Sequence, residues 1–387
     1  MFERLELLPA DPILGLGQQF AADPNPNKVG LSVGVYQDAQ GNTPILQSVK
    51  QAEAQLIKAQ LSKAYIPQAG DPTFIEQLTP LLLGPELAAS AAHRVALVQA
   101  PGGCGALRIA AEVAYAANRS ARIWVSTPTW ANHFPLLQAS GFELLTYPYY
   151  DADTATIEFE AMCAALRRAR AGDLVLLHAS CHNPTGADLT QPQWDTLLEL
   201  LAERELIPFI DSAYQGFAND LDSDVYGIRK AVERLPNVMV ATSCSKNFGL
   251  YRERTGAMLF AGSDAAQADA ARSHALSLAR RSYTMAPYHG GGIVGTILAS
   301  RELNALWRSE VNAMREHISN MRVEFSNSLA KHQARTASGG DFGFIARQCG
   351  MFSQLGIELD AIKQLRTDYG IYVLDDSRMN AAGLSAG

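Results

Sequence analysis

LVLLHASCHNPTGADLTQPQWDTLLELLAERELIPFIDSAY, residues 174–214, joins two short apolar runs through a longer amphipathic segment. The runs at 174–178 and 207–210 have the length and apolar composition of buried strands. Residues 193–204 have helical spacing, and the apolar positions that share one face are Trp194, Leu197, Leu198 and Leu201. A strand, a helix and a second strand in succession predict an α/β fold, with a mostly parallel sheet covered by helices on both faces.

Similar apolar runs recur on both sides of this stretch, and segments with helical spacing lie between most of them. The further runs lie at 95–99, 122–126, 144–147, 238–242 and 257–260. Together with the first two, they predict one mostly parallel sheet of seven strands.

The two ends of the chain differ from its middle. Residues up to about 45 contain prolines, glycines and one short apolar run. A long helical pattern at 303–332 is followed by predicted short strands at 342–346 and 371–374. We therefore expect two domains, a large one and a smaller α+β one built from both termini. Their expected ranges are 46–300 for the large domain, and 1–45 with 301–387 for the small one.

The composition of the 387 residues is that of a globular protein, with 48% hydrophobic and 18% charged residues. The net charge of −7 argues against a nucleic-acid surface, which needs a basic stripe. Five cysteines without a C-x-x-C spacing make a disulfide framework or a metal site unexpected, and favour a reducing compartment. The N-terminus lacks the apolar stretch of a signal peptide, and no segment has the roughly 20 uninterrupted apolar residues of a membrane span. We therefore expect a soluble, cytoplasmic protein without a metal centre.

Polar and glycine-rich segments follow the predicted strands, at the edge where open α/β sheets bind their ligands. Pro-Gly-Gly-Cys-Gly at 101–105 opens a predicted helix, and it is suited to cradle a phosphate or equally to form a plain tight turn. Trp130 follows the next strand, where a tryptophan either stacks on a flat ring or packs in the core. Asn183 comes after the run at 174–178, where it either donates a hydrogen bond to a ring oxygen or shapes the turn before a proline.

Two charged residues stand at the ends of apolar strands, where an unpaired charge is costly. Asp211 follows the run at 207–210, so it needs a cationic partner, either a protonated pyridine nitrogen or an arginine. Lys246 follows the run at 238–242; a desolvated lysine is a good imine-forming amine, whereas most lysines reach solvent. A phosphate cradle, a stacking tryptophan, a carboxylate and an amine at one sheet edge are the groups that pyridoxal phosphate requires.

Three motifs carry a resemblance to a known family. They are CHNPTG at 181–186, AYQGF at 213–217 and SKNFGLY at 245–251, within a similarity that runs from DPILGL at 11–16 to SRMN at 377–380. On these residues the chain resembles the aspartate and aromatic aminotransferases, subgroup I-alpha of the fold-type-I pyridoxal-phosphate enzymes. The resemblance implies pyridoxal phosphate as the cofactor, transamination as the reaction, and a homodimer with shared active sites.

The same resemblance implies a role for each matching residue. Lys246 binds the cofactor as a Schiff base and then carries the substrate proton, while Asp211 keeps the pyridine nitrogen protonated. Asn183 and Tyr214 hydrogen-bond the phenolic oxygen. The implied catalytic residues are thus Lys246, Asp211 and Tyr214. The other implied cofactor contacts are Gly103, Cys104, Trp130, Ser243, Arg254 and Tyr65 of the partner subunit.

Substrate contacts are implied in the same way. Arg378 grips the substrate α-carboxylate with the two-pronged geometry that a guanidinium offers, assisted by the backbone of Gly34. Arg280 of the partner subunit binds the distal carboxylate. Trp130 and Asn183 complete the implied substrate site.

Some positions depart from the family's pattern. Cys104 stands where serine or threonine is usual beside the phosphate, and a thiol is the weaker hydrogen-bond donor. Positions that make the pocket less polar, and so favour aromatic substrates, are Gln37, Ala64 and Met285. Positions that fit the aspartate-selective branch are Val35, Thr43 and Arg280.

The expected reaction is transamination between aspartate, or an aromatic amino acid, and 2-oxoglutarate, which gives oxaloacetate or an aromatic 2-oxo acid, and glutamate. An enzyme that prefers aromatic amino acids stays open as the alternative. A nicotinamide dehydrogenase would lack its dinucleotide fingerprint, and a non-catalytic amino-acid-binding protein would have no need of Lys246, Asp211 and Arg378. Gly387 lies about where the family begins its last helix. Either that helix is absent, which would loosen closure of the small domain, or the sequence is truncated.

Overall fold

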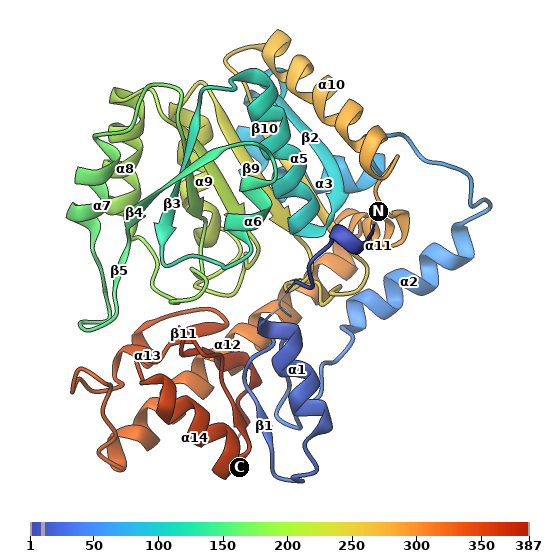
Figure 1. The fold of residues 1–387 in the computed structure, drawn as a ribbon. Helices are drawn as coiled ribbons and strands as arrows, with labels where there is room; N and C mark the ends of the chain where they lie inside the picture. Colours follow the sequence, from blue (N-terminus) through green and yellow to red (C-terminus); the bar gives the residue numbers. More distant parts are fainter. Residues whose placement is uncertain (1, 9–11, 386–387) are drawn as a thin grey trace.

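The computed structural model describes residues 2–8 and 12–385. Asp11, where the family resemblance begins, and Gly387, where the chain ends, lie outside the described residues. Figure 1 shows a large part built around a sheet, and a second part in which elements from both ends of the chain lie side by side. Over the described ranges, no helix is long and apolar enough to cross a membrane.

The central sheet has seven strands in the order β2-β10-β9-β8-β7-β3-β4. The strands are β2 (Val95–Pro101), β3 (Arg122–Thr127), β4 (Glu143–Pro148), β7 (Leu174–His178), β8 (Ile207–Ser212), β9 (Val238–Ser243) and β10 (Thr255–Ala261). Within this sheet only β10 runs antiparallel to its neighbours. The prediction of an α/β fold with a mostly parallel, seven-stranded sheet is confirmed.

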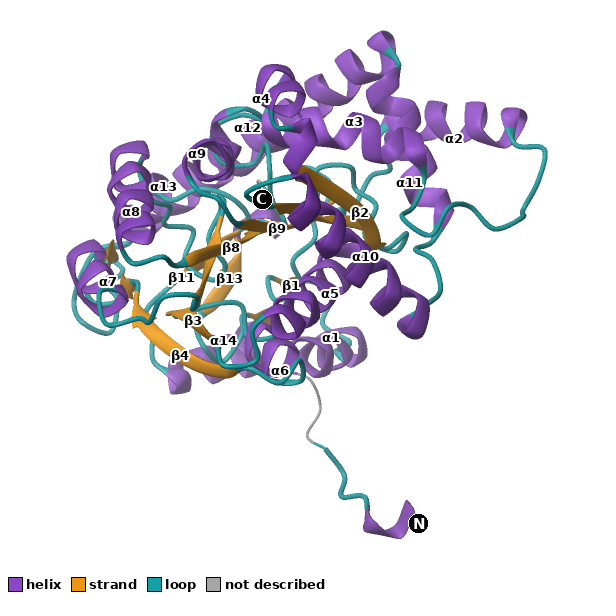
Figure 2. Ribbon diagram, turned by 90° about the horizontal axis from the view of Figure 1, so that it is seen from above, coloured by secondary structure: helices purple, strands orange, loops and turns teal. Residues whose placement is uncertain are grey.

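Alternate side chains of the parallel strands enter two different cores. In β7, Leu174 and Leu176 pack with α5 (Gly102–Ala117) and α10 (Ala265–Ser282), whereas the side chains between them face the opposite way. The helices of that opposite face include α7 (Phe159–Leu166), α8 (Gln191–Glu203), α9 (Tyr226–Arg234) and α11 (Tyr288–Ala299). Figure 2 shows the strands running between these two groups of helices. Further elements are α2 (Gln47–Ala59), α3 (Pro72–Leu83), α4 (Pro85–Ser90), α6 (His133–Gln138), β5 (Tyr150–Asp151) and β6 (Thr156–Ile157).

Helix α8 confirms the helix predicted at 193–204, between the apolar runs at 174–178 and 207–210. It begins with a capping box, in which the Thr190 hydroxyl accepts a hydrogen bond from the Gln193 N–H, and the Gln193 side chain accepts one from the Thr190 N–H. The four apolar residues of its predicted inner face are all buried. The helix returns the chain to β8, whose last residues include Asp211.

Both ends of the chain build the second part of the structure. β1 (Val29–Gly30) pairs in parallel with β12 (Ile371–Tyr372), to which the strand predicted at 371–374 is confined. β11 (Phe352–Gln354) pairs antiparallel with β13 (Arg378–Asn380). The long predicted helix is confirmed as α12, and the helices of this part are α1 (Pro12–Ala22), α12 (Arg301–Lys331), α13 (Phe344–Arg347) and α14 (Leu359–Tyr369). The domain boundaries at residues 45 and 300 stay a prediction.

The strand predicted at 342–346 is wrong, because the chain forms the short helix α13 there. An extended strand would point alternate side chains to opposite faces. The helical turn instead lets Phe342, Phe344 and Ile345 enter one core together. So short an apolar run does not by itself distinguish the two conformations.

A buried ion pair ties the start of β3 to the residue before β7. Asp173 is 1% exposed and accepts hydrogen bonds from the guanidinium and the backbone N–H of Arg122. The Trp124 indole and the Arg170 backbone N–H donate to the same carboxylate. Burial raises the pKa of Asp173, but these hydrogen bonds outweigh burial and leave the pKa below its ordinary value.

We expect Asp173→Ala to lower the free energy of unfolding by about 3 kcal/mol, because it leaves the Arg122 charge without its partner. In the wild type, this contribution is present above the unfolded-state pKa of about 3.9, and it is lost as the pH falls through the depressed folded-state pKa. Urea unfolding at several pH values measures both effects. Asp222→Ala is the matched control. It breaks the ion pair between Asp222 and Arg229, and the Asp222 side chain is 67% exposed. Equal losses of stability in the two variants would contradict the expectation.

Candidate active site

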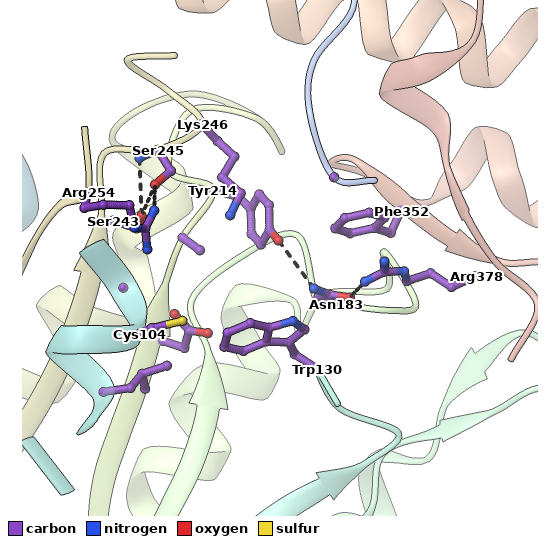
Figure 3. Close-up of a pocket in the computed structure, with 15 residues that line it drawn as sticks. Cys104, Trp130, Asn183, Tyr214, Ser243, Ser245, Lys246, Arg254, Phe352 and Arg378 are labelled. Carbon is purple, nitrogen blue, oxygen red and sulfur yellow. Dashed lines mark hydrogen bonds between the residues drawn. The ribbon is translucent and has the colours of Figure 1, made fainter. Parts of the chain in front are cut away.

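One cavity of about 230 Å³ brings together most of the predicted site residues. Its walls come from the N-terminus of α5, from the residues at and after the ends of β7, β8 and β9, and from the second part of the structure (Figure 3). We call that second part, which both ends of the chain build, the terminal part. It lies at the carboxyl ends of the parallel strands, as the fold class predicts. The predicted residues that line it are Gly34, Gly103, Cys104, Trp130, Asn183, Asp211, Tyr214, Ser243, Lys246, Arg254 and Arg378.

Two predicted site residues do not line this cavity. Tyr65 is 87% exposed in the segment between α2 and α3, and Arg280 is exposed near the end of α10. Both positions are predicted to serve the cavity of a second subunit, and that stays a prediction.

Four residues that line the cavity were not singled out from the sequence, namely Leu107, Ala213, Ser245 and Phe352. Ala213 and Ser245 stand next to predicted residues in the motifs, so their positions were an available signal. Phe352 gave no such signal, because its strand β11 is only three residues long and was not predicted.

Cationic and hydroxyl groups surround the N-terminus of α5. Gly102 has a φ of +69°, and a side chain there would lie 2.5 Å from an Arg254 nitrogen, so glycine leaves room for the guanidinium. Arg254 donates to the Ser245 hydroxyl and to the Tyr251 carbonyl, and the described residues give it no carboxylate partner. The Ser243 hydroxyl donates to that of Ser245 at 3.1 Å. A guanidinium, hydroxyls and a helix N-terminus make a site for an anion.

The Asp211 carboxylate, in β8, contacts His133, which lies beside a second histidine, His178. His133 Nε2 lies 3.2 Å from Asp211 Oδ2, and His133 Nδ1 lies 2.8 Å from the Thr129 hydroxyl. The rings of His133 and His178 are 5.3 Å apart, and neither histidine was singled out from the sequence. Burial raises the pKa of Asp211, but the hydrogen bond with His133 and the electrostatic contributions of the nearby histidines and Lys246 outweigh burial and leave the pKa below its ordinary value. Asp211 therefore offers a buried, ionised carboxylate to a cationic partner in the cavity.

Lys246 enters the cavity just after β9 (Figure 3). Its Nζ lies 5.0 Å from the centre of the Tyr214 ring, and among the residues that the structure describes it has no hydrogen bond or ion pair. Burial is the main cause of the lowered pKa of Lys246, and Arg254 and Arg378 act in the same direction. The charge of Asp211 opposes them. A neutral amine is therefore available at a lower pH than in an exposed lysine, as nucleophilic and base chemistry require.

Arg378 ends a hydrogen-bonded chain along the wall of the cavity. Asn183 Nδ2 donates to the Tyr214 hydroxyl at 3.4 Å, and Arg378 Nη1 donates to Asn183 Oδ1 at 3.2 Å (Figure 3). Arg378 Nη2 donates to the Ser32 carbonyl at 3.0 Å, while its buried Nε has no partner among the described residues. The guanidinium also stacks 4.4 Å from the centre of the Phe352 ring. A buried guanidinium beside a cavity, without a carboxylate of its own, is suited to bind one.

Comparison with known proteins gives matches along the whole chain. The sequence model of the family described as class I and II aminotransferases matches residues 26–387. The aspartate aminotransferase of Salmonella typhi is 44% identical over 385 residues, which cover 100% of this chain and 96% of that protein. An aromatic-amino-acid aminotransferase from Burkholderia pseudomallei, solved covalently bound to pyridoxal phosphate, is 40% identical with a TM-score of 0.95. A psychrophilic aromatic amino acids aminotransferase from Psychrobacter sp. B6, cocrystallised with aspartic acid, is 40% identical with a TM-score of 0.94. Each structure matches 100% of this chain and 96% of its own.

Proposed function

Because the chain belongs to the class I and II aminotransferases, we propose that the cavity is its active site and that Lys246, Asp211 and Tyr214 are its catalytic residues. The enzyme catalyses transamination, in which an amino group passes between an amino acid and a 2-oxo acid, and its cofactor is pyridoxal phosphate. One observation carries the assignment of the site. One cavity holds a lysine amine and a guanidinium nitrogen that have no partner among the described residues, together with an ionised carboxylate.

The residues of the cavity fit the polar groups of this cofactor. Its phosphate suits the N-terminus of α5 at Gly103 beside Arg254, where the described residues supply a cation and no carboxylate. A protonated ring nitrogen suits Asp211, whose ionised form needs a cationic partner. The phenolic oxygen suits the Asn183 amide and the Tyr214 hydroxyl. The remaining proposed cofactor contacts are Cys104, Trp130, Ser243 and Lys246, with Tyr65 of the partner subunit.

When bound, pyridoxal phosphate supplies an electron sink for the negative charge that develops at the substrate Cα. Lys246 Nζ holds the cofactor in the resting enzyme, and during turnover it accepts and returns the Cα proton, for which its lowered pKa keeps a neutral amine available. Asp211 stays ionised at neutral pH because its pKa is lowered, and it therefore retains a proton on the ring nitrogen. Tyr214 stays protonated because burial raises its pKa, so its hydroxyl is available as a donor.

Arg378 is the proposed partner of the substrate α-carboxylate. Stacking on Phe352 holds the guanidinium in position. Its Nε has no partner among the described residues and is therefore available for a two-pronged bond to a carboxylate. Gly34 leaves room for the Phe352 ring on which Arg378 stacks, because a side chain at this position would lie 2.6 Å from that ring. Asn183 and Trp130 line the same region.

The proposed substrates are aspartate or an aromatic amino acid with 2-oxoglutarate. The Salmonella relative supports aspartate, as does Arg280, which would bind a distal carboxylate from a second subunit. The Burkholderia relative and the apolar Met285 support aromatic substrates. Since Arg280 and Tyr65 do not line the cavity of their own chain, this assignment requires a homodimer. Exposed apolar side chains support such an assembly, namely Phe2, Leu5, Leu7, Leu8, Ile57 and Leu61.

The visible absorption of the protein saturated with pyridoxal phosphate tests the function. Aspartate and, in a separate sample, phenylalanine are added, and at least one is expected to convert the band to a pyridoxamine-type band at shorter wavelength. The amino acid that does so at the lower concentration identifies the preferred substrate. A spectrum that neither amino acid changes would contradict the proposed substrates.

Arg280→Leu separates the two substrate classes. Loss of a charge-assisted bond to the distal carboxylate is expected to raise the aspartate concentration for half conversion about 100-fold, and to leave that for phenylalanine within about threefold. Arg281→Leu, at the exposed neighbouring position, is the control. An equal change for both amino acids would show that Arg280 does not bind the distal carboxylate.

Cys104→Thr is expected to bind the cofactor about two- to tenfold more tightly than the wild type. Cys104 lines the cavity at the start of α5, and burial raises the pKa of its thiol, so it stands there as a neutral, weak donor. A hydroxyl makes a stronger hydrogen bond to phosphate, worth about 1 kcal/mol. Titration of the apoenzyme with pyridoxal phosphate measures the change, with Cys163→Ser in α7 as the control. Equal dissociation constants for the wild type and Cys104→Thr would refute the expectation.

A further inference from the structure

Two thiols and a carboxylate from distant parts of the chain meet outside the active-site cavity. The sulfur atoms of Cys181 and Cys349 and a carboxylate oxygen of Asp188 lie within 4.8 Å of one another. Cys181 and Asp188 belong to the loop after β7, and Cys349 belongs to the segment between α13 and β11. The cluster therefore lies where the large part of the structure meets the terminal part.

Main-chain hydrogen bonds hold these groups in place. Asp188 accepts the N–H of Cys181 at 2.6 Å and that of His182 at 2.8 Å. The Cys349 thiol donates to Asp188 Oδ2 at 3.1 Å, and its backbone N–H donates to the Gly186 carbonyl at 2.9 Å. The three groups converge because the backbone orders them, which is the preorganisation that a metal site needs.

A buried cation lies beside the cluster without a carboxylate bonded to it. Arg322 of α12 is 1% exposed and donates to the carbonyls of Cys349 and Gly350, and the described residues give it no ion pair. Burial lowers the pKa of Arg322 to about 10, and the charges of the three clustered groups act against that fall. Two thiolates and one carboxylate carry three negative charges, whereas Arg322 and a divalent cation carry three positive charges. A filled site would therefore be neutral, which a buried place favours.

The ligand atoms decide which ion fits. Two sulfurs and one carboxylate oxygen suit Zn²⁺ and other soft divalent ions, whereas Mg²⁺ and Ca²⁺ prefer oxygen ligands only. Cys181 is buried, but Cys349 and Asp188 are partly exposed, so an ion can enter from their side.

We propose that Cys181, Asp188 and Cys349 form a Zn²⁺ site whose fourth ligand is water. Binding replaces two thiol protons, which leave to solvent. The ion would join the loop that carries Asn183 to the segment that carries Phe352, so it would fasten two walls of the active site together. The expectation of no metal site rested on cysteine spacing, which does not show that residues so far apart in sequence meet.

Zinc binding to the holoenzyme, with Zn²⁺ as the only added ligand and a phosphine as reductant, tests the proposal. The wild type is expected to retain one Zn²⁺ per chain after dialysis and to show a higher Tm with Zn²⁺ than without it. Cys349→Ser is expected to bind Zn²⁺ at least about tenfold more weakly and to lose the Tm shift. Asp188→Asn, which keeps an acceptor oxygen but no charge, serves as the second variant if Cys349→Ser folds poorly.

Cys163→Ala, in α7, is the control, and it should bind Zn²⁺ as the wild type does. Equal zinc affinity in the wild type, Cys349→Ser and Asp188→Asn would overturn the proposal. Zinc binding that Cys104→Ser removes and Cys349→Ser does not would place the ion in the active-site cavity, and would overturn it as well. So would a holoenzyme that binds no Zn²⁺ while its reduced thiols are intact.

Discussion

Lys246→Ala is expected to lower kcat by at least about 10⁴-fold, because it removes both the amine that holds the cofactor and the group that moves the Cα proton. Lys246 is the lysine that lines the cavity, and its pKa is lowered chiefly by loss of solvent around the amine. No neighbouring side chain can take over both roles, since Tyr214 keeps its proton and Arg378 cannot act as a base. Steady-state kinetics with the preferred amino acid and 2-oxoglutarate measure the effect.

The control for this variant is Lys230→Ala, which removes a lysine paired with Glu233 on α9, away from the cavity. It should leave kcat within about twofold of the wild type. Far-ultraviolet circular dichroism must show that Lys246→Ala is folded. A folded Lys246→Ala enzyme with a kcat within tenfold of the wild type would remove Lys246 from the mechanism.

Arg378→Lys is expected to lower kcat/KM by about 10²- to 10³-fold, mainly through a higher KM for both substrates. An ammonium keeps the charge but loses the planar fork that binds a carboxylate at two points. It also loses the bonds to Asn183 and Ser32 that fix the side chain. Truncating one partner of a buried, hydrogen-bonded charge pair costs about 2–5 kcal/mol, which gives the expected range.

The cofactor band of Arg378→Lys should resemble that of the wild type, because Arg378 is proposed to contact substrate and not cofactor. Arg335→Lys changes the same residue type at an exposed position of the terminal part and should have no effect. An unchanged KM for amino acid and 2-oxo acid in Arg378→Lys would show that another residue binds the α-carboxylate.

Local patterns in the sequence predicted the sheet and the long helices well. Residues 174–214 place a capped helix between two apolar strands. The cap and the apolar runs can be predicted because each involves only residues within one helical turn or one strand. The apolar run at 342–346 was wrongly predicted as a strand. The chain forms the four-residue helix α13 there, and Phe342, Phe344 and Ile345 pack in one core, whereas a strand would point alternate side chains to opposite faces. The short strands β11 and β13 pair through three residues each, too few for any periodicity to be visible.

The same limit explains which site residues the sequence revealed. Asp211 and Lys246 come after apolar runs that predict buried strands, so their depth in the fold could be predicted from composition. His133 and Phe352 reach the site through contacts between segments far apart in the chain, and only the fold brings them there. Cys349 shows the same effect outside the cavity, since it meets a loop that no spacing rule connects to it.

Borohydride reduction of the holoenzyme tests most directly whether Lys246 holds the cofactor. Reduction fixes pyridoxal phosphate to the lysine that holds it, and peptide mass spectrometry then identifies that residue. We expect a single labelled lysine, Lys246, in the peptide that contains SKNFGLY. Label on any other lysine, such as Lys50 or Lys230, with Lys246 unmodified, would contradict it.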